Sequence, residues 1–172
     1  MQQAELAAPS SETLASIRLA VFDFDGVFTD NHVWVDGEGG EIVRCSRADG
    51  LGLRRLSEVG VDALVVSMET APVVNARTRK LGVACLQGIE EKLPVLREEA
   101  AAREIGLDAV AYVGNDVNDV ECLGAVGLPV CPADAWPEAR ELASWVLTRS
   151  GGEGCVREFC DAVWTAHVGA RA

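Results

Sequence analysis

Two aspartates one residue apart, Asp23 and Asp25, follow the apolar run from Leu19 to Phe22. A short and wholly apolar run is typical of a buried strand, which would deliver both carboxylates to its carboxyl end. Two acids held so close together would repel and desolvate each other unless a bound cation compensated for their charge. The pair therefore indicates a carboxylate nucleophile that works with the help of magnesium.

The rest of the chain alternates between strand-like apolar runs and amphipathic, helix-like runs. Strands are predicted at 17–24, 61–67, 82–87, 108–114 and 126–132. Helices are predicted between them, at 51–60, 71–82, 90–106 and 117–125. This alternation predicts an α/β fold, a doubly wound, Rossmann-like parallel sheet with helices on both faces. In such a sheet ligands bind at the carboxyl ends of the strands, where the aspartate pair is expected.

Residues 32–44 interrupt the alternation, because two β-rich arms surround the turn sequence Asp-Gly-Glu-Gly-Gly. They are predicted to form a β-hairpin inserted after the first strand. The apolar side chains of this hairpin are too many to stay bare on a monomer: Val33, Trp34, Val35, Ile42 and Val43. Either another subunit covers them or the hairpin folds back onto its own domain.

The length of 172 residues favours a single domain, predicted over 17–172 without a cap domain and behind a flexible tail over 1–16. The formal net charge of −12 argues against nucleic acids and anionic membranes as partners. The six cysteines form no Cys-x-x-Cys pair, and no apolar run reaches membrane-spanning length. We therefore expect reduced thiols and a cytoplasmic location.

Four features carry a family resemblance. In chain order they are the segment Asp-Phe-Asp-Gly-Val-Phe-Thr-Asp-Asn at 23–31, Ser67, Lys92, and Gly-Asn-Asp-Val-Asn-Asp at 114–119. They resemble the four ordered motifs of the haloacid dehalogenase (HAD) superfamily. Within it the chain is similar to the small capless phosphatases that act on octulosonate and nonulosonate phosphates. It also resembles the C-terminal domain of some acylneuraminate cytidylyltransferases, and the resemblance covers the chain from about residue 17 onward.

The resemblance implies a role for each matching side chain. Asp23 would attack the phosphorus atom and form an aspartyl-phosphate that water later hydrolyses. Asp25 would protonate the leaving sugar oxygen and then deprotonate that water. Ser67 would bind a phosphoryl oxygen, and Lys92 would neutralise the phosphoryl group. Without the motifs plainer roles are open, since Asp25 could cap a turn, Ser67 could cap a helix and Lys92 could be a solvated charge.

The fourth motif departs from the family at Asn115, where the family usually has an aspartate that binds magnesium. The amide oxygen of Asn115 could still bind Mg²⁺ without adding charge, and Asp116 and Asp119 could supply the missing charge. The predicted Mg²⁺ site consists of Asp23, the backbone carbonyl of Asp25 and the Asn115–Asp116 pair, completed by water. Which of residues 115, 116 and 119 touches the metal stays open. The motif could also cap the next helix.

A second departure concerns the substrate. Octulosonate phosphatases typically have an arginine two residues after the motif-two serine, where this chain has Glu69. Nonulosonate 9-phosphate phosphatases have a glutamate there, with basic residues that match Arg77 and Lys80. The predicted substrate is thus a nonulosonate 9-phosphate of the N-acetylneuraminate or deoxynononate type. Arg77 or Lys80 would pair with its carboxylate and Glu69 would orient its hydroxyl groups, although an exposed face making surface ion pairs would also explain the two basic residues.

Other functions also fit. The chain could be a 3-deoxy-octulosonate 8-phosphate phosphatase, a phosphotransferase or phosphomutase of the same superfamily, or a non-catalytic oligomerisation module. The lack of a cap insertion speaks against the transferases, because these need an enclosed site. Retention of the catalytic side chains speaks against a non-catalytic module. The resemblance further implies a homotetramer, and it implies that the glycine-rich segment at 151–154, which leads into a predicted final helix, could reach toward an active site.

Overall fold

The computed structural model describes residues 8–171. Its centre is a parallel sheet of six strands in the order β5-β4-β1-β6-β7-β8. The strands are β1 (Leu19–Phe22), β4 (Asp62–Val66), β5 (Ala84–Leu86), β6 (Val110–Val113), β7 (Leu128–Cys131) and β8 (Trp145–Val146). The strand order reverses at β1, which lies between β4 and β6. The predicted α/β fold with a doubly wound parallel sheet is therefore confirmed.

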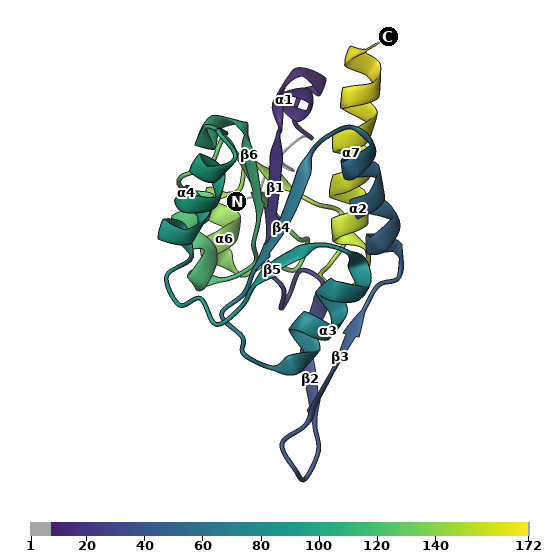
Figure 1. The fold of residues 1–172 in the computed structure, drawn as a ribbon, viewed down its shortest axis with the longest axis vertical. Coiled ribbons are helices and arrows are strands. Elements are labelled where there is room, and N and C mark those ends of the chain that lie inside the picture. Colours follow the sequence, from purple (N-terminus) through teal and green to yellow (C-terminus); the bar gives the residue numbers. More distant parts are fainter. Residues whose placement is uncertain (1–7, 172) are drawn as a thin grey trace, which may run out of the picture.

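Helices cover both faces of the sheet (Figure 1). On one face lie α1 (Ser11–Ser16), α2 (Ala48–Glu58) and the C-terminal helix α7 (Cys155–Ala170). The other face carries α4 (Lys92–Ala102), the short α5 (Val120–Leu123) and α6 (Pro137–Leu142). The helix α3 (Pro72–Leu81) connects β4 to β5, and 3₁₀ turns occur at Leu107–Ala109 and Val117–Asp119.

The central strand β1 is buried on both faces, which explains why its sequence is wholly apolar. Phe22 points into the core under α2 and α7, where its ring meets Phe159 edge to face at 5.6 Å. Val21 points into the opposite core, together with Leu96 of α4. Both faces thus hold β1 in place, and its carboxyl end presents Asp23 at a well-defined position.

The inserted hairpin forms a separate antiparallel pair, β2 (Thr29–Val35) and β3 (Glu41–Cys45). It projects beyond the carboxyl ends of the sheet strands, at the lower end of Figure 1. The predicted hairpin at 32–44 is confirmed, and both arms extend slightly further than the prediction. The apolar side chains near its tip stay exposed in the single chain, including Trp34 and Ile42.

Two elements escaped the sequence analysis. The strand β8 has two residues, too few for a hydrophobic period, and α6 has six residues and begins at Pro137. The helix predicted at 117–125 is a 3₁₀ turn followed by the four residues of α5. Within the predicted tail, Ser10 caps α1 and Leu14 is buried beside α7, whereas residues 1–7 lie outside the described residues. Among residues 8–171 no helix is both long and apolar enough to cross a bilayer.

Candidate active site

A cavity of about 160 Å³ opens at the carboxyl ends of the central strands. It lies at the point where the strand order reverses, which is the usual ligand site of a doubly wound sheet. Six residues singled out from the sequence line it: Asp23, Asp25, Ser67, Glu69, Asn115 and Asp116. The other lining residues, which the sequence analysis did not single out, are Asn31, Met68 and Asn118. The fold therefore brings together side chains from three separate stretches of the chain, 23–31, 67–69 and 115–118.

Asp23 and Lys92 form a buried ion pair in the floor of this cavity. The Lys92 ammonium lies 2.8 Å from Oδ1 of Asp23, and the two residues are 2% and 4% exposed. The backbone N–H of Phe24 donates to the same oxygen at 2.7 Å. Oδ2 of Asp23 has no hydrogen-bond partner among the described residues. Lys92 reaches this place because it is the first residue of α4, whose start faces the strand ends.

One ammonium serves two buried carboxylates, since Lys92 also lies 2.8 Å from Oδ1 of Asp119. Burial raises the pKa of Asp23, the nearby charge of Asp119 raises it further, and Lys92 opposes both effects. Burial alone would lower the pKa of Lys92, but Asp23 and Asp119 outweigh it and the pKa is raised. The lysine therefore stays charged, but it is shared by two carboxylates, so ionisation of Asp23 leaves one negative charge in the floor of the cavity without a counterpart.

Asp119 is fully buried, and all of its hydrogen-bond acceptor positions are occupied. Its Oδ1 accepts hydrogen bonds from Lys92 and from the hydroxyl of Tyr112, at 2.8 and 2.7 Å. Its Oδ2 accepts from the backbone N–H groups of Asn115 and Asp116, at 2.8 and 3.3 Å. A carboxylate has about four such positions. Asp119 therefore holds Lys92 and the 114–119 loop in place, and Tyr112 is a contributor that the motif reading missed.

Asn115 presents an unpaired acceptor beside the two motif-one aspartates. The residue is 4% exposed, and its Oδ1 is buried without a hydrogen-bond partner in the described structure. Its amide packs so tightly on Gly26 that a Cβ there would lie 2.1 Å from Nδ2. Asp116 caps the 3₁₀ turn, and its Oδ1 accepts from the N–H of Val117 at 2.7 Å. The predicted capping role of this motif is therefore real, and it leaves Oδ1 of Asn115 free to meet a ligand.

The donor set at this place suits magnesium. Carboxylate, amide and backbone oxygens are the ligands that Mg²⁺ prefers, with water completing its shell. Among residues 8–171 no three His, Cys, Asp or Glu side chains gather as a metal cluster by themselves. The unpaired Oδ1 of Asn115 and the uncompensated charge around Asp23 both fit a cation. Asp119 fits less well, because its oxygens are already occupied.

Asp25 and Ser67 face the cavity from two neighbouring strand ends. Burial raises the pKa of Asp25, and a hydrogen bond from the hydroxyl of Thr29 partly offsets this. Ser67 is 1% exposed, and its Oγ accepts from the N–H of Glu69 at 3.1 Å. The hydroxyl hydrogen of Ser67 is thus available to an acceptor in the cavity, such as a phosphoryl oxygen.

The residues predicted to bind the substrate lie in two different places. Glu69 lines the cavity, directly beyond Ser67. Arg77 lies on α3 and donates to the backbone carbonyl of Ser46 at 2.7 Å, and its buried Nε has no partner in the described structure. Lys80 is exposed on the same helix. Within one chain neither basic side chain lines the cavity.

Comparison with known proteins agrees with the motifs. No protein-family model matches the chain. It is 35% identical over 153 residues to the 3-deoxy-D-manno-octulosonate 8-phosphate phosphatase KdsC of Yersinia pestis, covering 88% of this chain and 82% of that one. A HAD family hydrolase structure from Streptomyces avermitilis is 41% identical, with a TM-score of 0.85 over 92% of this chain and 90% of the other.

A further similar structure contains both a metal ion and phosphate. It is the 3-deoxy-D-manno-octulosonate 8-phosphate phosphatase of Moraxella catarrhalis in complex with a magnesium ion, a phosphate ion and a KDO molecule. It is 27% identical to this chain, with a TM-score of 0.88 over 92% of this chain and 91% of the other. These relatives, the capless α/β fold and the four motifs around one cavity agree. The chain belongs to the HAD superfamily, within its KdsC-like sugar-acid phosphate phosphatases, and is a phosphoric monoester hydrolase.

Proposed function

We propose that the protein is a magnesium-dependent phosphatase that hydrolyses a nonulosonate 9-phosphate through a phosphorylated Asp23. The observation that carries this proposal is the Asp23 carboxylate itself. One of its oxygens is tied to Lys92 and to the N–H of Phe24, and the residue lines the cavity. This leaves Oδ2 to attack a phosphorus atom bound there.

In the proposed reaction each side chain has one task. Oδ2 of Asp23 forms a bond to phosphorus while the bond from phosphorus to the sugar oxygen breaks. Asp25 gives a proton to that leaving oxygen and later takes one from the water that releases phosphate. The Ser67 hydroxyl and the Lys92 ammonium hold the phosphoryl oxygens. Charge stabilisation and covalent catalysis act together, because phosphate monoesters are among the slowest substrates to react uncatalysed.

The proposed metal ligands are Asp23, the backbone carbonyl of Asp25, Asn115 and Asp116. When bound there, Mg²⁺ would neutralise negative charge on the phosphoryl group and on Asp23. Support comes from the unpaired, buried Oδ1 of Asn115 and from the raised pKa of Asp23. Because Asn115 adds no charge, we expect Mg²⁺ to bind more tightly to an Asn115→Asp variant. Isothermal titration with MgCl₂ measures this without any turnover.

Glu69, which lines the cavity, supports the nine-carbon substrate, because it matches the glutamate of the nonulosonate 9-phosphate phosphatases at the position where octulosonate phosphatases typically have an arginine. Arg77 and Lys80 are proposed to bind the sugar carboxylate. Since neither lines the cavity of its own chain, we propose that they serve the cavity of a neighbouring copy in a homotetramer. The exposed apolar residues of the hairpin would form the contacts of that assembly.

Hydrolysis of 3-deoxy-octulosonate 8-phosphate is the second candidate, and the similarity to phosphatases of that ester favours it. Both substrates carry a carboxylate and a primary phosphate ester, so the chemistry at Asp23 would be the same. The six free thiols support the expected reducing, cytoplasmic location in either case.

The test is a phosphate-release assay on N-acetylneuraminate 9-phosphate and 3-deoxy-octulosonate 8-phosphate, with and without MgCl₂. We expect turnover only with Mg²⁺, a higher kcat/KM for the nine-carbon ester, and no turnover by Asp23→Asn. Equal phosphate release by Asp23→Asn and the wild type would refute the nucleophile. Preference for the eight-carbon ester would refute the proposed use of Glu69, Arg77 and Lys80.

A further inference from the structure

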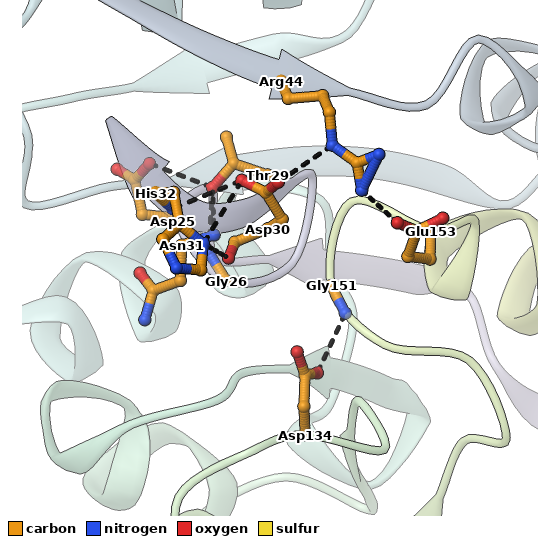
Figure 2. A network of polar contacts seen from close by, with 10 residues as sticks. All are labelled: Asp25, Gly26, Thr29, Asp30, Asn31, His32, Arg44, Asp134, Gly151 and Glu153. Carbon is orange, nitrogen blue, oxygen red and sulfur yellow. Dashed lines mark hydrogen bonds and ion pairs between the residues drawn. The ribbon is translucent and has the colours of Figure 1, made fainter. Parts of the chain in front are cut away.

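Thr29 is a buried threonine directly beneath the motif-one loop, and none of the roles described so far uses it. It is the first residue of β2 and is 0% exposed. Figure 2 shows its side chain among Asp25, Gly26 and Asn31. Gly26 and Asn31 both have positive φ angles, of 79° and 62°, so the chain turns tightly just before β2 and again at the third residue of β2.

The hydroxyl of Thr29 has three partners in the segment from Asp25 to Asn31. The backbone N–H groups of Gly26 and Asn31 donate to its Oγ1 at 3.1 and 3.2 Å. Its own hydrogen is donated to Oδ1 of Asp25, at 3.3 Å. A hydroxyl has one hydrogen and two acceptor positions. Because the two N–H groups occupy both acceptor positions, Thr29 can serve Asp25 only as a donor.

This arrangement distinguishes the two oxygens of Asp25. Oδ1 accepts the Thr29 hydrogen and so cannot carry a proton toward Thr29 at the same time. Oδ2 has no hydrogen-bond partner among the described residues, and the residue lines the cavity. We propose that Thr29 is a positioning residue of the phosphatase reaction, which binds Oδ1 of Asp25 and thereby places the exchangeable proton on Oδ2.

Oδ2 of Asp25 then gives up one proton and takes one back in each reaction cycle. As the bond from phosphorus to the sugar oxygen breaks, the Oδ2–H bond of Asp25 also breaks, and the leaving oxygen keeps the proton. In the second half, water forms a bond to phosphorus and gives a proton back to Oδ2. The bond between phosphorus and Asp23 breaks, which releases phosphate and restores both carboxyl groups. Throughout, Thr29 keeps its hydrogen and donates it to Oδ1.

The role of Thr29 rests on the proposed role of Asp25. Substrates with different leaving groups test the two roles separately. A sugar alkoxide needs a proton as it leaves, whereas p-nitrophenolate leaves readily without one. We therefore compare kcat/KM for p-nitrophenyl phosphate with kcat/KM for whichever sugar-acid phosphate the wild type hydrolyses. Placement of a general acid contributes on the order of 10²–10⁴-fold. Asp25→Asn is thus expected to lose about 10³-fold on the sugar ester and far less on the aryl ester.

Thr29→Val removes the hydroxyl but keeps the shape of the side chain. We expect about a 30-fold loss of kcat/KM on the sugar ester and a loss below about threefold on p-nitrophenyl phosphate. Thr29→Ser keeps the hydroxyl and is expected to stay within about threefold of the wild type on both esters. In an Asp25→Asn background, Thr29→Val should lower kcat/KM on the sugar ester by less than about a further threefold, because both changes act on the same proton.

The matched control is Thr78→Val, which removes another buried threonine hydroxyl. Thr78 is 1% exposed and donates to the backbone carbonyl of Val74 at 2.9 Å, away from the cavity. It should leave the ratio of the two kcat/KM values unchanged. Equal losses on both esters in Thr29→Val would overturn the positioning role, and so would a loss in Thr29→Ser as large as in Thr29→Val.

Two failures are distinguishable. If Asp25→Asn shows no dependence on the leaving group, the proposed acid–base role of Asp25 fails, and the role of Thr29 fails with it. If Asp25→Asn shows the dependence and Thr29→Val does not, only the role of Thr29 fails. Should Thr29→Val not fold, Thr29→Ala in the same assay decides between these outcomes.

Discussion

The floor of the active site buries its charged side chains and pairs them, whereas the hairpin leaves apolar side chains exposed. In the floor, Lys92 and Asp119 are 2% and 0% exposed, and every oxygen of Asp119 has a donor. On the hairpin, Trp34 and Ile42 are 57% and 64% exposed. The first region is complete within one chain, whereas the second presents apolar surface that a single chain does not cover. Substitutions should therefore affect stability and chemistry in the floor, and assembly in the hairpin.

The largest effect is expected at Lys92, because its removal leaves two buried carboxylates without their cation. Breaking a buried ion pair from one side costs about 3–5 kcal/mol. Lys92→Met should lower the free energy of unfolding by that amount in urea titrations and abolish phosphate release. Arg97→Met, an exposed position on the same helix, should change the free energy of unfolding by less than about 0.5 kcal/mol. Similar values for the two variants would contradict the picture of a tightly coupled floor.

A buried acid without a bonded cation provides a second comparison. Asp49 is 0% exposed, and burial raises its pKa to about 6, with hydrogen bonding from the N–H of Arg157 and the charge of Arg77 opposing the shift. Since the folded pKa lies above the unfolded value, the carboxyl destabilises the fold as pH rises from 4 through 6. A shift from 3.8 to about 6 corresponds to roughly 3 kcal/mol.

Asp49→Asn should remove this pH dependence. The difference in unfolding free energy between variant and wild type should therefore move in favour of the variant by up to roughly 3 kcal/mol between pH 4 and pH 8. Urea titrations at a series of pH values measure it. The control is Asp36→Asn in the hairpin turn, where hydrogen bonds from Gly40 and Glu38 hold the pKa of the carboxyl low. A pH-independent difference for Asp49→Asn would rule out the raised pKa.

A smaller effect is expected at Tyr112, whose ring stays buried when only the hydroxyl is removed. Tyr112→Phe leaves one acceptor position of Asp119 unfilled, which costs about 1–3 kcal/mol. Lys92 should then move its hydrogen bonding toward Asp119 and away from the phosphoryl group, so that kcat falls about tenfold while KM changes little. Steady-state kinetics and urea titration test both parts. A change in KM alone would indicate that Tyr112 acts on substrate binding.

The smallest change in stability is expected at the hairpin tip. Trp34→Ser should change the unfolding free energy of the subunit by less than about 0.5 kcal/mol, yet convert the proposed tetramer to smaller species. Light scattering coupled to size exclusion measures the mass. Trp136→Ser is a matched control, since Trp136 is 56% exposed and lies outside the hairpin. If Trp34→Ser keeps the wild-type mass, the hairpin does not form the assembly contact.

Motif spacing located most of the site because chemistry restricts residue types at strand ends. Asp23, Ser67 and Asn115 each follow a buried strand, and such positions can be read from apolar runs. Tyr112 could not be read in this way, because it lies inside an apolar strand and looks like a core residue. Thr29 likewise looks like a β-branched residue at the start of a strand. Their importance depends on which carboxylate each hydroxyl meets.

The sequence by itself determined the α/β fold, the superfamily and the aspartate pair, since these follow from local hydrophobic patterns and from motif order. Only the tertiary structure decided which role each acidic side chain has. It fills the acceptor positions of Asp119 and leaves Oδ1 of Asn115 free, and it ties one oxygen of Asp25 to Thr29. Hydrogen-bond partners far apart in sequence decide these roles, and a one-dimensional pattern does not contain them. For the same reason the fold leaves Arg77 and Lys80 off the cavity of their own chain, although the family resemblance implies that they bind the substrate.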